Sequence, residues 1–312
     1  MDVCGAKDVV HTYFSGGPVS IDIIEKNLYL GSLSAAKDVK TLRSYKITHI
    51  LTIDTCPLPR YVEEGNKLTT KFVQLSDQPK EDLLSHFDDC ITFIEDGLAK
   101  GVVLVHCYFG VSRSASVIIA YVMKKYGISY YEAFEKVKSK RSIVYPNQGF
   151  VSQLKLYKEM GYTIDSSSMK YKVFRLSVAA DKVRKVKILP NDYFDLIKPD
   201  PGVTQSRPEP NVYRCKRCRR VLASESNLII HKDKSTNQQC TKTYFLEPLS
   251  WMDIIQSMQG KLHCPKCNNK VGSFSWIMGC QCPCGSLVAP AFYLTPSKID
   301  WTNVVKNVEV TI

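Results

Sequence analysis

The fold of this chain is indicated first by residues 106–114, whose sequence is HCYFGVSRS. The short apolar run Val102–Val105 before this stretch predicts a strand, and the apolar run Ser116–Met123 after it predicts a helix. A loop between a strand and a helix N-terminus can direct several backbone N–H groups at one point, and the helix dipole adds positive potential there. The context therefore predicts a binding site for a phosphate dianion.

The side chains of this stretch suit phosphoryl transfer. Arg113 carries a planar guanidinium that can bind two phosphate oxygens at once. The positive potential favours the ionised form of Cys107, and a thiolate is a nucleophile. Gly110 allows a tight turn, Ser114 can donate a hydrogen bond to the leaving thiolate, and His106 is expected to organise the loop and support the thiolate. The residues expected to bind the phosphate are Tyr108, Phe109, Gly110, Val111, Ser112 and Arg113. The pattern predicts a cysteine-dependent phosphatase.

The reaction also needs a proton donor for the leaving oxygen, normally a carboxylic acid on a mobile loop. Asp77 follows a strand-like run and precedes a turn-forming proline, although its position fits an ordinary turn aspartate equally well. Three other aspartates, Asp82, Asp88 and Asp89, fall in a predicted amphipathic helix, Glu81–Leu98, and are interpreted as its solvated face. Asp77 is therefore the candidate acid.

Short strands alternate with longer helices across residues 21–161, which predicts an α/β core with a largely parallel sheet. This part of the chain resembles the dual-specificity phosphatases of the protein-tyrosine phosphatase superfamily. The matching segments are Asn27–Gly31, Ile47–Leu51, Asp77, Cys107–Arg113 and Asn147–Phe150. The resemblance implies a central, mostly parallel sheet flanked by helices.

The resemblance also implies the role of each site residue. Cys107 would be the nucleophile, Arg113 would bind the phosphate, and Asp77 would act as general acid and then as base for the attacking water. Asn147 would brace the phosphate loop. Inositol-lipid phosphatases tend to place lysines within the loop, whereas residues 108–112 carry no charge. We therefore expect phosphoprotein substrates, and a short domain suggests a shallow site open to phosphoserine and phosphothreonine beside phosphotyrosine.

Length and composition indicate a two-domain globular protein. The chain has 312 residues, 44% of them hydrophobic, and a net charge of +12. No apolar run approaches the roughly eighteen residues of a membrane span, so no membrane association is expected. Residues 1–20 do not resemble a secretory signal, and we expect a cytoplasmic and nuclear protein. In that setting the twelve cysteines are predicted to be thiols and metal ligands.

Eight of the cysteines lie between Cys215 and Cys284. Cys215 and Cys218 form one Cys-x₂-Cys pair, Cys264 and Cys267 form another, and such pairs offer two thiolates to one tetrahedral ion. The spacing predicts two closed structural zinc sites, while no cofactor is expected to be needed for catalysis. The predicted ligands are Cys215, Cys218, His231, Cys240, Cys264, Cys267, Cys282 and Cys284. From spacing alone, Cys280, Cys282 or Cys284 is surplus, and the pairing can be sequential or interleaved.

The predicted organisation has four parts: an N-terminal extension (1–20), a catalytic domain (21–165), a basic helix with a linker (166–210) and a zinc domain (211–312). The linker is assigned to the Pro- and Gly-containing stretch 199–210. The run Arg214–Arg220 holds five basic residues in seven positions. It is either a footprint for nucleic acid or another polyanion, or an ordinary solvated face.

A phosphatase joined to a cysteine-rich domain resembles the Yvh-type dual-specificity phosphatases. The matching segments in the second half are Tyr213–Arg220, Tyr244–Met252, Leu262–Cys267, Gly272–Trp276, Cys282–Gly285 and Pro290–Phe292. The resemblance selects Cys282 and Cys284 as ligands and leaves Cys280 as the extra thiol. It also implies a role in maturation of the large ribosomal subunit, with the zinc domain on a protein or ribosomal RNA surface of the pre-ribosome. An alternative is a binding and release factor whose phosphatase activity is dispensable.

Overall fold

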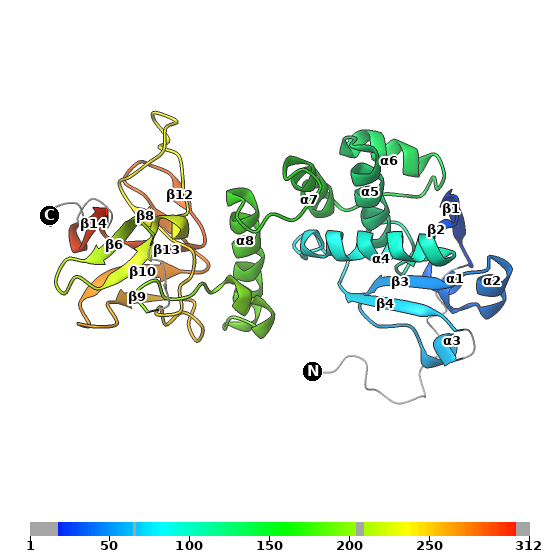
Figure 1. Ribbon diagram of the computed structural model, residues 1–312, viewed down its shortest axis with the longest axis horizontal. Helices are drawn as coiled ribbons and strands as arrows, with labels where there is room; N and C mark the ends of the chain where they lie inside the picture. The colour runs from blue at the N-terminus through cyan, green and yellow to red at the C-terminus, as the bar shows by residue number, and fades with distance from the viewer. Residues whose placement is uncertain (1–17, 65–66, 204–208, 304–312) are drawn as a thin grey trace, which may run out of the picture. The chain divides into compact units, whose positions relative to one another are not determined.

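The computed structural model describes residues 18–64, 67–203 and 209–303. The chain forms two compact units that divide between Asp165 and Ser166, and each is described by itself (Figure 1). Most of the predicted N-terminal extension, residues 1–17, and part of the predicted linker, residues 204–208, lie outside the described residues. Among the described residues, no helix combines the length and the apolar character that crossing a bilayer requires.

The first unit is built on a five-stranded sheet with the order β1-β2-β5-β3-β4. Strand β1 (Ile21–Glu25) pairs antiparallel with β2 (Leu28–Gly31). The remaining neighbours, β2 with β5 (Val103–His106), β5 with β3 (His49–Asp54) and β3 with β4 (Thr69–Gln74), pair in parallel. Every residue of β3 and β5 is buried, as expected for central parallel strands covered on both faces.

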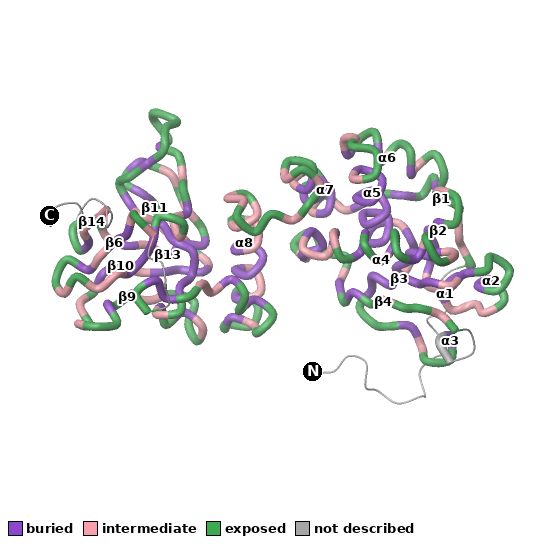
Figure 2. The backbone as a smooth tube through the Cα atoms, in the orientation of Figure 1, coloured by how far each residue is buried: buried purple, intermediate pink, exposed green. Residues whose placement is uncertain are grey.

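Helices cover both faces of this sheet. They are α1 (Leu33–Lys37), α2 (Val39–Ser44), α3 (Arg60–Glu64), α4 (Phe87–Lys100), α5 (Arg113–Tyr126), α6 (Tyr130–Lys138) and α7 (Gln148–Glu159), with a 3₁₀ turn at Leu84–His86. Helix α5 is buried from Arg113 to Met123, because it packs between the sheet and α4, α6 and α7 (Figure 2). The predicted α/β fold with a mostly parallel sheet is confirmed.

The predicted helix Glu81–Leu98 is shorter than expected, and two of its aspartates have hydrogen-bond partners in the fold. Asp82 is buried and accepts hydrogen bonds from the backbone N–H and the hydroxyl of Ser85. Asp88 accepts hydrogen bonds from Tyr157 Oη (2.7 Å) and from Ile164 N (2.6 Å). Only Asp89 is exposed as predicted. Helical spacing cannot reveal such partners, because Tyr157 and Ile164 are distant in the sequence.

The second unit combines one long helix, α8 (Met169–Val186), with small antiparallel sheets. Its 3₁₀ turns lie at Asn191–Leu196, Glu225–Asn227 and Pro296–Lys298. One sheet has the order β8 (Tyr244–Phe245), β13 (Ala291–Leu294), β10 (Lys270–Ser275) and β9 (Gln259–His263). The others are β14 (Ile299–Asn303), β6 (Asn211–Cys215) and β7 (Val221–Ser224), and the hairpin of β11 (Cys280–Gln281) and β12 (Leu287–Val288).

Aromatic side chains form part of the core of this unit. The Trp276 and Phe292 rings meet edge to face, with centroids 4.7 Å apart, and Phe274 stacks on Phe292. Buried residues of α8, including Leu176 and Val183, belong to the same core. The basic helix α8 therefore belongs to the second unit, which begins at Ser166, because its apolar face packs into this core.

Candidate active site and metal centres

The carbonyl groups of the loop between β5 and α5 are hydrogen-bonded to residues outside the loop. Four consecutive oxygens accept hydrogen bonds: Tyr108 O from Leu33 N (3.0 Å), Phe109 O and Gly110 O from the Arg141 guanidinium (both 2.9 Å), and Val111 O from Tyr145 N (2.9 Å). In a planar trans peptide the C=O and the next N–H point in opposite directions. The N–H groups of residues 109–112 therefore face the inner side of the loop, where Gly110 N donates to Cys107 Sγ at 3.3 Å.

Cys107 lies at the base of this loop, and its side chain is buried. Its Sγ accepts a second hydrogen bond, from Ser114 Oγ at 3.1 Å. Both donors stabilise negative charge on the sulfur. Gly110 has a φ of +70°, and a Cβ at this position would overlap the carbonyl oxygen of Gly31. The structure thus brings Cys107, Gly110 and Ser114 together.

Arg113 is the first residue of α5, and its side chain is only 8% exposed. Nη1 donates to Asp54 Oδ1 (2.6 Å) and to the carbonyl oxygen of Leu75 (3.1 Å). Among the described residues, Nε has no hydrogen-bond partner, and Asp77 Oδ2 lies 4.0 Å from it. A buried donor without an acceptor is costly. This donor is therefore suited to bind an anionic oxygen at the loop.

Asp77 lies beside the phosphate loop. Its Oδ1 accepts hydrogen bonds from Ser112 Oγ (2.8 Å) and from Asn147 Nδ2 (2.7 Å), and Asn147 N donates to the same Ser112 hydroxyl (3.1 Å). Asn147 also caps α7, where its Oδ1 accepts from Phe150 N. The structure therefore links Asp77 and Asn147 to the loop, and it directs the Ser112 side chain to the carboxylate, leaving the Ser112 N–H for an anion.

The segment that carries Asp77 is packed on α7. Gln153 Oε1 accepts hydrogen bonds from Leu83 N (2.9 Å) and Leu84 N (2.8 Å), and its Nε2 donates to the carbonyl oxygen of Glu81. A Cβ on Gly149 would overlap the backbone of Pro79, so only glycine allows this close approach. These contacts hold the segment after Asp77 against α7.

His106 is fully buried at the end of β5. Its Nε2 lies 2.8 Å from Thr52 Oγ1, and Nδ1 lies 3.4 Å from the carbonyl oxygen of Cys107. Burial lowers the pKa of His106 to about 4, so the ring is neutral at physiological pH. The neutral ring organises the loop by hydrogen bonding, and it does not supply positive charge to the sulfur.

Two further residues, Asp54 and Arg141, hold this site and were not predicted from the sequence. Asp54 pairs with Arg113, and the only signal for it is an acidic residue at the carboxyl end of a buried strand. Arg141, which holds the loop carbonyls, also donates to Asp22 Oδ2 (2.6 Å) and Ser20 Oγ (2.9 Å) and is 1% exposed. It follows the lysines of a basic run, where a charged residue is normally solvated, and so nothing in the sequence distinguished it.

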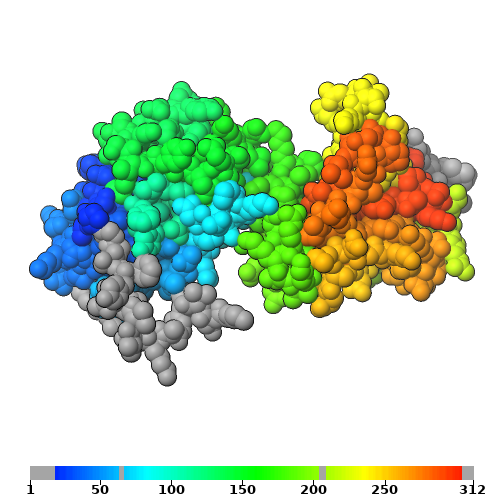
Figure 3. All heavy atoms as spheres, turned by 180° about the vertical axis from the view of Figure 1, so that it is seen from behind, coloured from blue at the N-terminus to red at the C-terminus, as the bar shows by residue number. Residues whose placement is uncertain are grey.

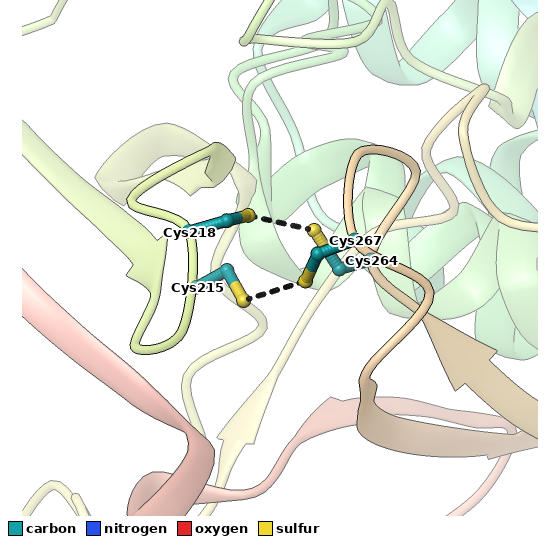
Figure 4. A group of neighbouring side chains, drawn as sticks. All are labelled: Cys215, Cys218, Cys264 and Cys267. Carbon is teal, nitrogen blue, oxygen red and sulfur yellow. Dashed lines mark hydrogen bonds between the residues drawn. The ribbon is translucent and has the colours of Figure 1, made fainter.

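In the second unit, one group of thiols joins the two Cys-x₂-Cys pairs. Their sulfurs all lie within 4.8 Å of one another, with Cys215 Sγ 3.7 Å from Cys267 Sγ and Cys218 Sγ 3.5 Å from Cys264 Sγ (Figure 4). The pairs follow β6 and β9. Each turn closes with a left-handed residue, Arg219 or Asn268, whose N–H donates to the carbonyl of the first cysteine. The two pairs therefore form matching knuckles that face each other.

A second group consists of His231, Cys240, Cys282 and Cys284, again with ligand atoms within 4.8 Å. His231 Nε2 lies 3.5 Å from Cys284 Sγ, and Cys240 Sγ lies 3.7 Å from Cys282 Sγ. The stretches near residues 235 and 285 lie against each other in the space-filling view (Figure 3). The pairing is therefore interleaved along the chain. Cys280 lies outside both groups and donates to the carbonyl oxygen of Gln281.

Both groups have the chemistry of a structural metal site. They supply four thiolates in one case, and three thiolates and an imidazole in the other, which are ligands that suit zinc. Burial opposes ionisation, but backbone N–H donors and neighbouring thiols lower the pKa of Cys218 to about 7 and that of Cys284 to about 6. One ligand of each group is thus readily available as the thiolate that a metal requires. Both groups could hold a metal ion.

Comparison with known proteins agrees with this geometry. Residues 28–160 match the family described as dual specificity phosphatase, catalytic domain. Dual specificity protein phosphatase MPK-4 of Drosophila melanogaster is 44% identical, over 96% of this chain and 92% of its own length. Dual specificity protein phosphatase 12 of Homo sapiens is 36% identical, over 89% and 87%. Tyrosine-protein phosphatase yvh1 of Schizosaccharomyces pombe is 32% identical, over 96% and 89%. This chain belongs to the Yvh1-type family of dual-specificity protein phosphatases.

Proposed function

We propose that the first unit hydrolyses phosphotyrosine, phosphoserine and phosphothreonine in proteins through a phosphocysteine intermediate. The observation that supports this most directly is the position of Cys107 Sγ, which lies at the base of inward-facing N–H groups and is hydrogen-bonded to Gly110 N and Ser114 Oγ. The Cys107 thiolate attacks phosphorus, an S–P bond forms, and the bond between phosphorus and the leaving oxygen breaks. Arg113 Nε and the loop N–H groups bind the phosphoryl oxygens.

Asp77 is the proposed proton donor. Its Oδ1 is occupied by Ser112 and Asn147, which leaves Oδ2 to carry the proton toward the leaving oxygen. In the second step, the Asp77 carboxylate accepts a proton from water as the water oxygen attacks phosphorus. The S–P bond then breaks, and Ser114 Oγ stabilises the departing thiolate. Inorganic phosphate is released, and no metal takes part in either step.

Trapping of the intermediate tests this proposal. Full-length protein is mixed with para-nitrophenyl phosphate or with phosphotyrosine and phosphothreonine peptides, quenched in acid and digested. We expect a phosphoryl adduct on the Cys107 peptide with every substrate, and its absence from Cys107→Ser. An adduct on another residue, or turnover of Cys107→Ser at the wild-type rate, would refute the proposed chemistry.

We also propose that each cysteine group binds one structural zinc ion. The first would be held by Cys215, Cys218, Cys264 and Cys267, and the second by His231, Cys240, Cys282 and Cys284. Four protein ligands leave no open position for a substrate, so the ions would contribute to folding. The interleaved pairing supports this role, because each ion would cross-link segments far apart in the sequence.

A second function concerns the zinc unit, which we propose docks on a protein or RNA surface of the pre-ribosomal large subunit. The support is the basic run at the first knuckle, where Lys216 and Arg217 are exposed. The run is less free than its composition suggests, because Arg219 pairs with Asp300 and Arg220 pairs with Asp200. Such a role would require this protein to be present in both the nucleus and the cytoplasm. In the alternative form of this proposal, phosphatase activity is dispensable for assembly.

A rescue experiment separates these functions. Cells lacking the protein receive wild type, Cys107→Ser, or Cys264→Ser with Cys267→Ser, and large-subunit levels are measured on sucrose gradients. We expect Cys107→Ser to rescue and the knuckle variant to fail if docking is the essential activity. Failure of Cys107→Ser would instead place dephosphorylation in the assembly step. Rescue by the knuckle variant, with normal subunit levels, would refute the docking role.

A further inference from the structure

Exposed apolar side chains gather beside the phosphate loop. Phe109, within the loop, is 59% exposed, and Ile143 and Tyr145, in the segment before α7, are 50% and 65% exposed. Large apolar side chains in such positions lose the stabilisation that burial provides. We name these three residues the apolar rim.

Backbone contacts hold the rim together. Arg141, at one end of the segment, donates to Phe109 O, and Tyr145 N donates to Val111 O, so residues 141–145 run alongside the loop. Arg141 and Val144 are each 1% exposed and anchor the segment, which leaves Ile143 and Tyr145 facing outward. The rim is therefore a fixed surface attached to the scaffold that also orients the phosphate-binding N–H groups.

We propose that the apolar rim determines substrate specificity by binding an apolar side chain next to the phosphorylated residue. This inference rests on the proposed phosphatase function and names the substrate class. A phosphoprotein segment whose phosphate lies over Cys107 must pass this surface, because Phe109 and Val111 belong to the phosphate loop itself. The loop offers no charged side chain between Cys107 and Arg113 to select charged neighbours. Aromatic anchors in such positions typically dominate binding energy.

Peptide kinetics test the inference. Three phosphotyrosine peptides carry leucine, serine or glutamate on both sides of the phosphotyrosine, and the glutamate peptide tests whether nearby lysines such as Lys140 select acidic substrates. For wild type we expect kcat/KM to be about 10-fold higher with leucine than with serine, mainly through KM. In Ile143→Ser with Tyr145→Ala, the preference should fall below about 2-fold. Para-nitrophenyl phosphate carries no neighbouring residue, so its turnover should not change in Ile143→Ser alone.

Matched variants exclude a general loss of structure. Tyr145→Phe keeps the ring and should retain the leucine preference. Tyr126→Ala removes a 50% exposed tyrosine at the opposite end of α5 and should also retain it. Equal kcat/KM for leucine and serine peptides in wild type, or a preference for glutamate, would overturn the inference while the phosphatase proposal stands. Absence of turnover on every substrate, para-nitrophenyl phosphate included, would overturn both.

Discussion

The two units of this protein surround cysteine sulfur in different ways. In the first unit, Cys107 Sγ accepts hydrogen bonds from Gly110 N and Ser114 Oγ, within a loop whose N–H groups face inward. In the second unit, two groups of four ligand atoms lie within 4.8 Å of one another. The first arrangement prepares one thiolate for an incoming electrophile, whereas the second brings together the ligands of a cation. The same side chain is thus a proposed nucleophile or a proposed ligand according to its neighbours.

The units also differ in what holds them together. The first buries two central strands and most of α5, so apolar burial provides most of its core. The second has short strands, some of only two residues, and its buried residues include several thiols. Small units of this kind depend on metal or disulfide cross-links. We therefore expect the second unit to need metal and the first to fold without it.

The largest expected effect comes from the first knuckle. Cys264→Ser with Cys267→Ser should unfold the second unit, because one structural zinc site contributes on the order of 10 kcal/mol to folding. All three tryptophans lie in this unit, and Trp276 is buried at 1% exposure, so the emission should shift toward that of exposed indole. Turnover of an aryl phosphate should be retained. Cys280→Ser is the matched control and should keep two zinc ions per chain by metal analysis. Loss of aryl phosphate turnover in the Cys264→Ser, Cys267→Ser variant would contradict the expectation that the first unit folds without the second.

The next effect separates the proposed nucleophile from an inert thiol in the same unit. Cys107→Ser should lower kcat by about 10⁶-fold without changing thermal stability, since it removes only the attacking atom. Cys90 is also buried, but burial raises its pKa to about 12, so it remains a protonated thiol. Iodoacetamide should therefore modify Cys107 and leave Cys90 intact at neutral pH. Faster modification of Cys90, measured by mass spectrometry, would contradict the proposed difference.

A smaller effect is expected for the proposed acid. Asp77→Asn should reduce kcat on an alkyl phosphate such as a phosphothreonine peptide by about 10²–10⁴-fold, the usual contribution of a general acid. Substrates with a good leaving group, such as para-nitrophenyl phosphate, need less protonation and should lose less. Asp89→Asn, at an exposed position on α4, serves as the control and should behave as wild type. Equal losses on both substrate types would argue against proton donation by Asp77.

The smallest effect is a pH dependence confined to the first unit. Burial lowers the pKa of His106 from 6.5 to about 4, so between these values the unfolded chain binds more protons than the folded one. The free energy of unfolding should therefore fall as the pH drops from about 6.5 to about 4, by about 3 kcal/mol from this residue. Hydrogen exchange of α5 amides measures this change, and His106→Asn should flatten it. An unchanged slope in that variant would assign the dependence to other groups.

The sequence was most informative where function depends on residues close together in the chain. The segment from His106 to Ser114 forms one strand–loop–helix connection, so residues that lie close together in the sequence, Cys107, Gly110 and Ser114, also meet in the fold. Each Cys-x₂-Cys knuckle is equally local. In both cases, a few backbone turns fix the geometry of the side chains, and the residue types indicate the chemistry of the site.

Tertiary structure decided the features that join distant segments. Asp54 pairs with Arg113, Arg141 holds the loop carbonyls, and Asp88 accepts a hydrogen bond from Tyr157, and each of these partners is distant in the sequence. The interleaved pairing of the two cysteine groups likewise depends on how the antiparallel strands are arranged. The physical reason is the same throughout, because a buried polar group must find its partners in space, and local sequence periodicity does not show which distant segment provides them.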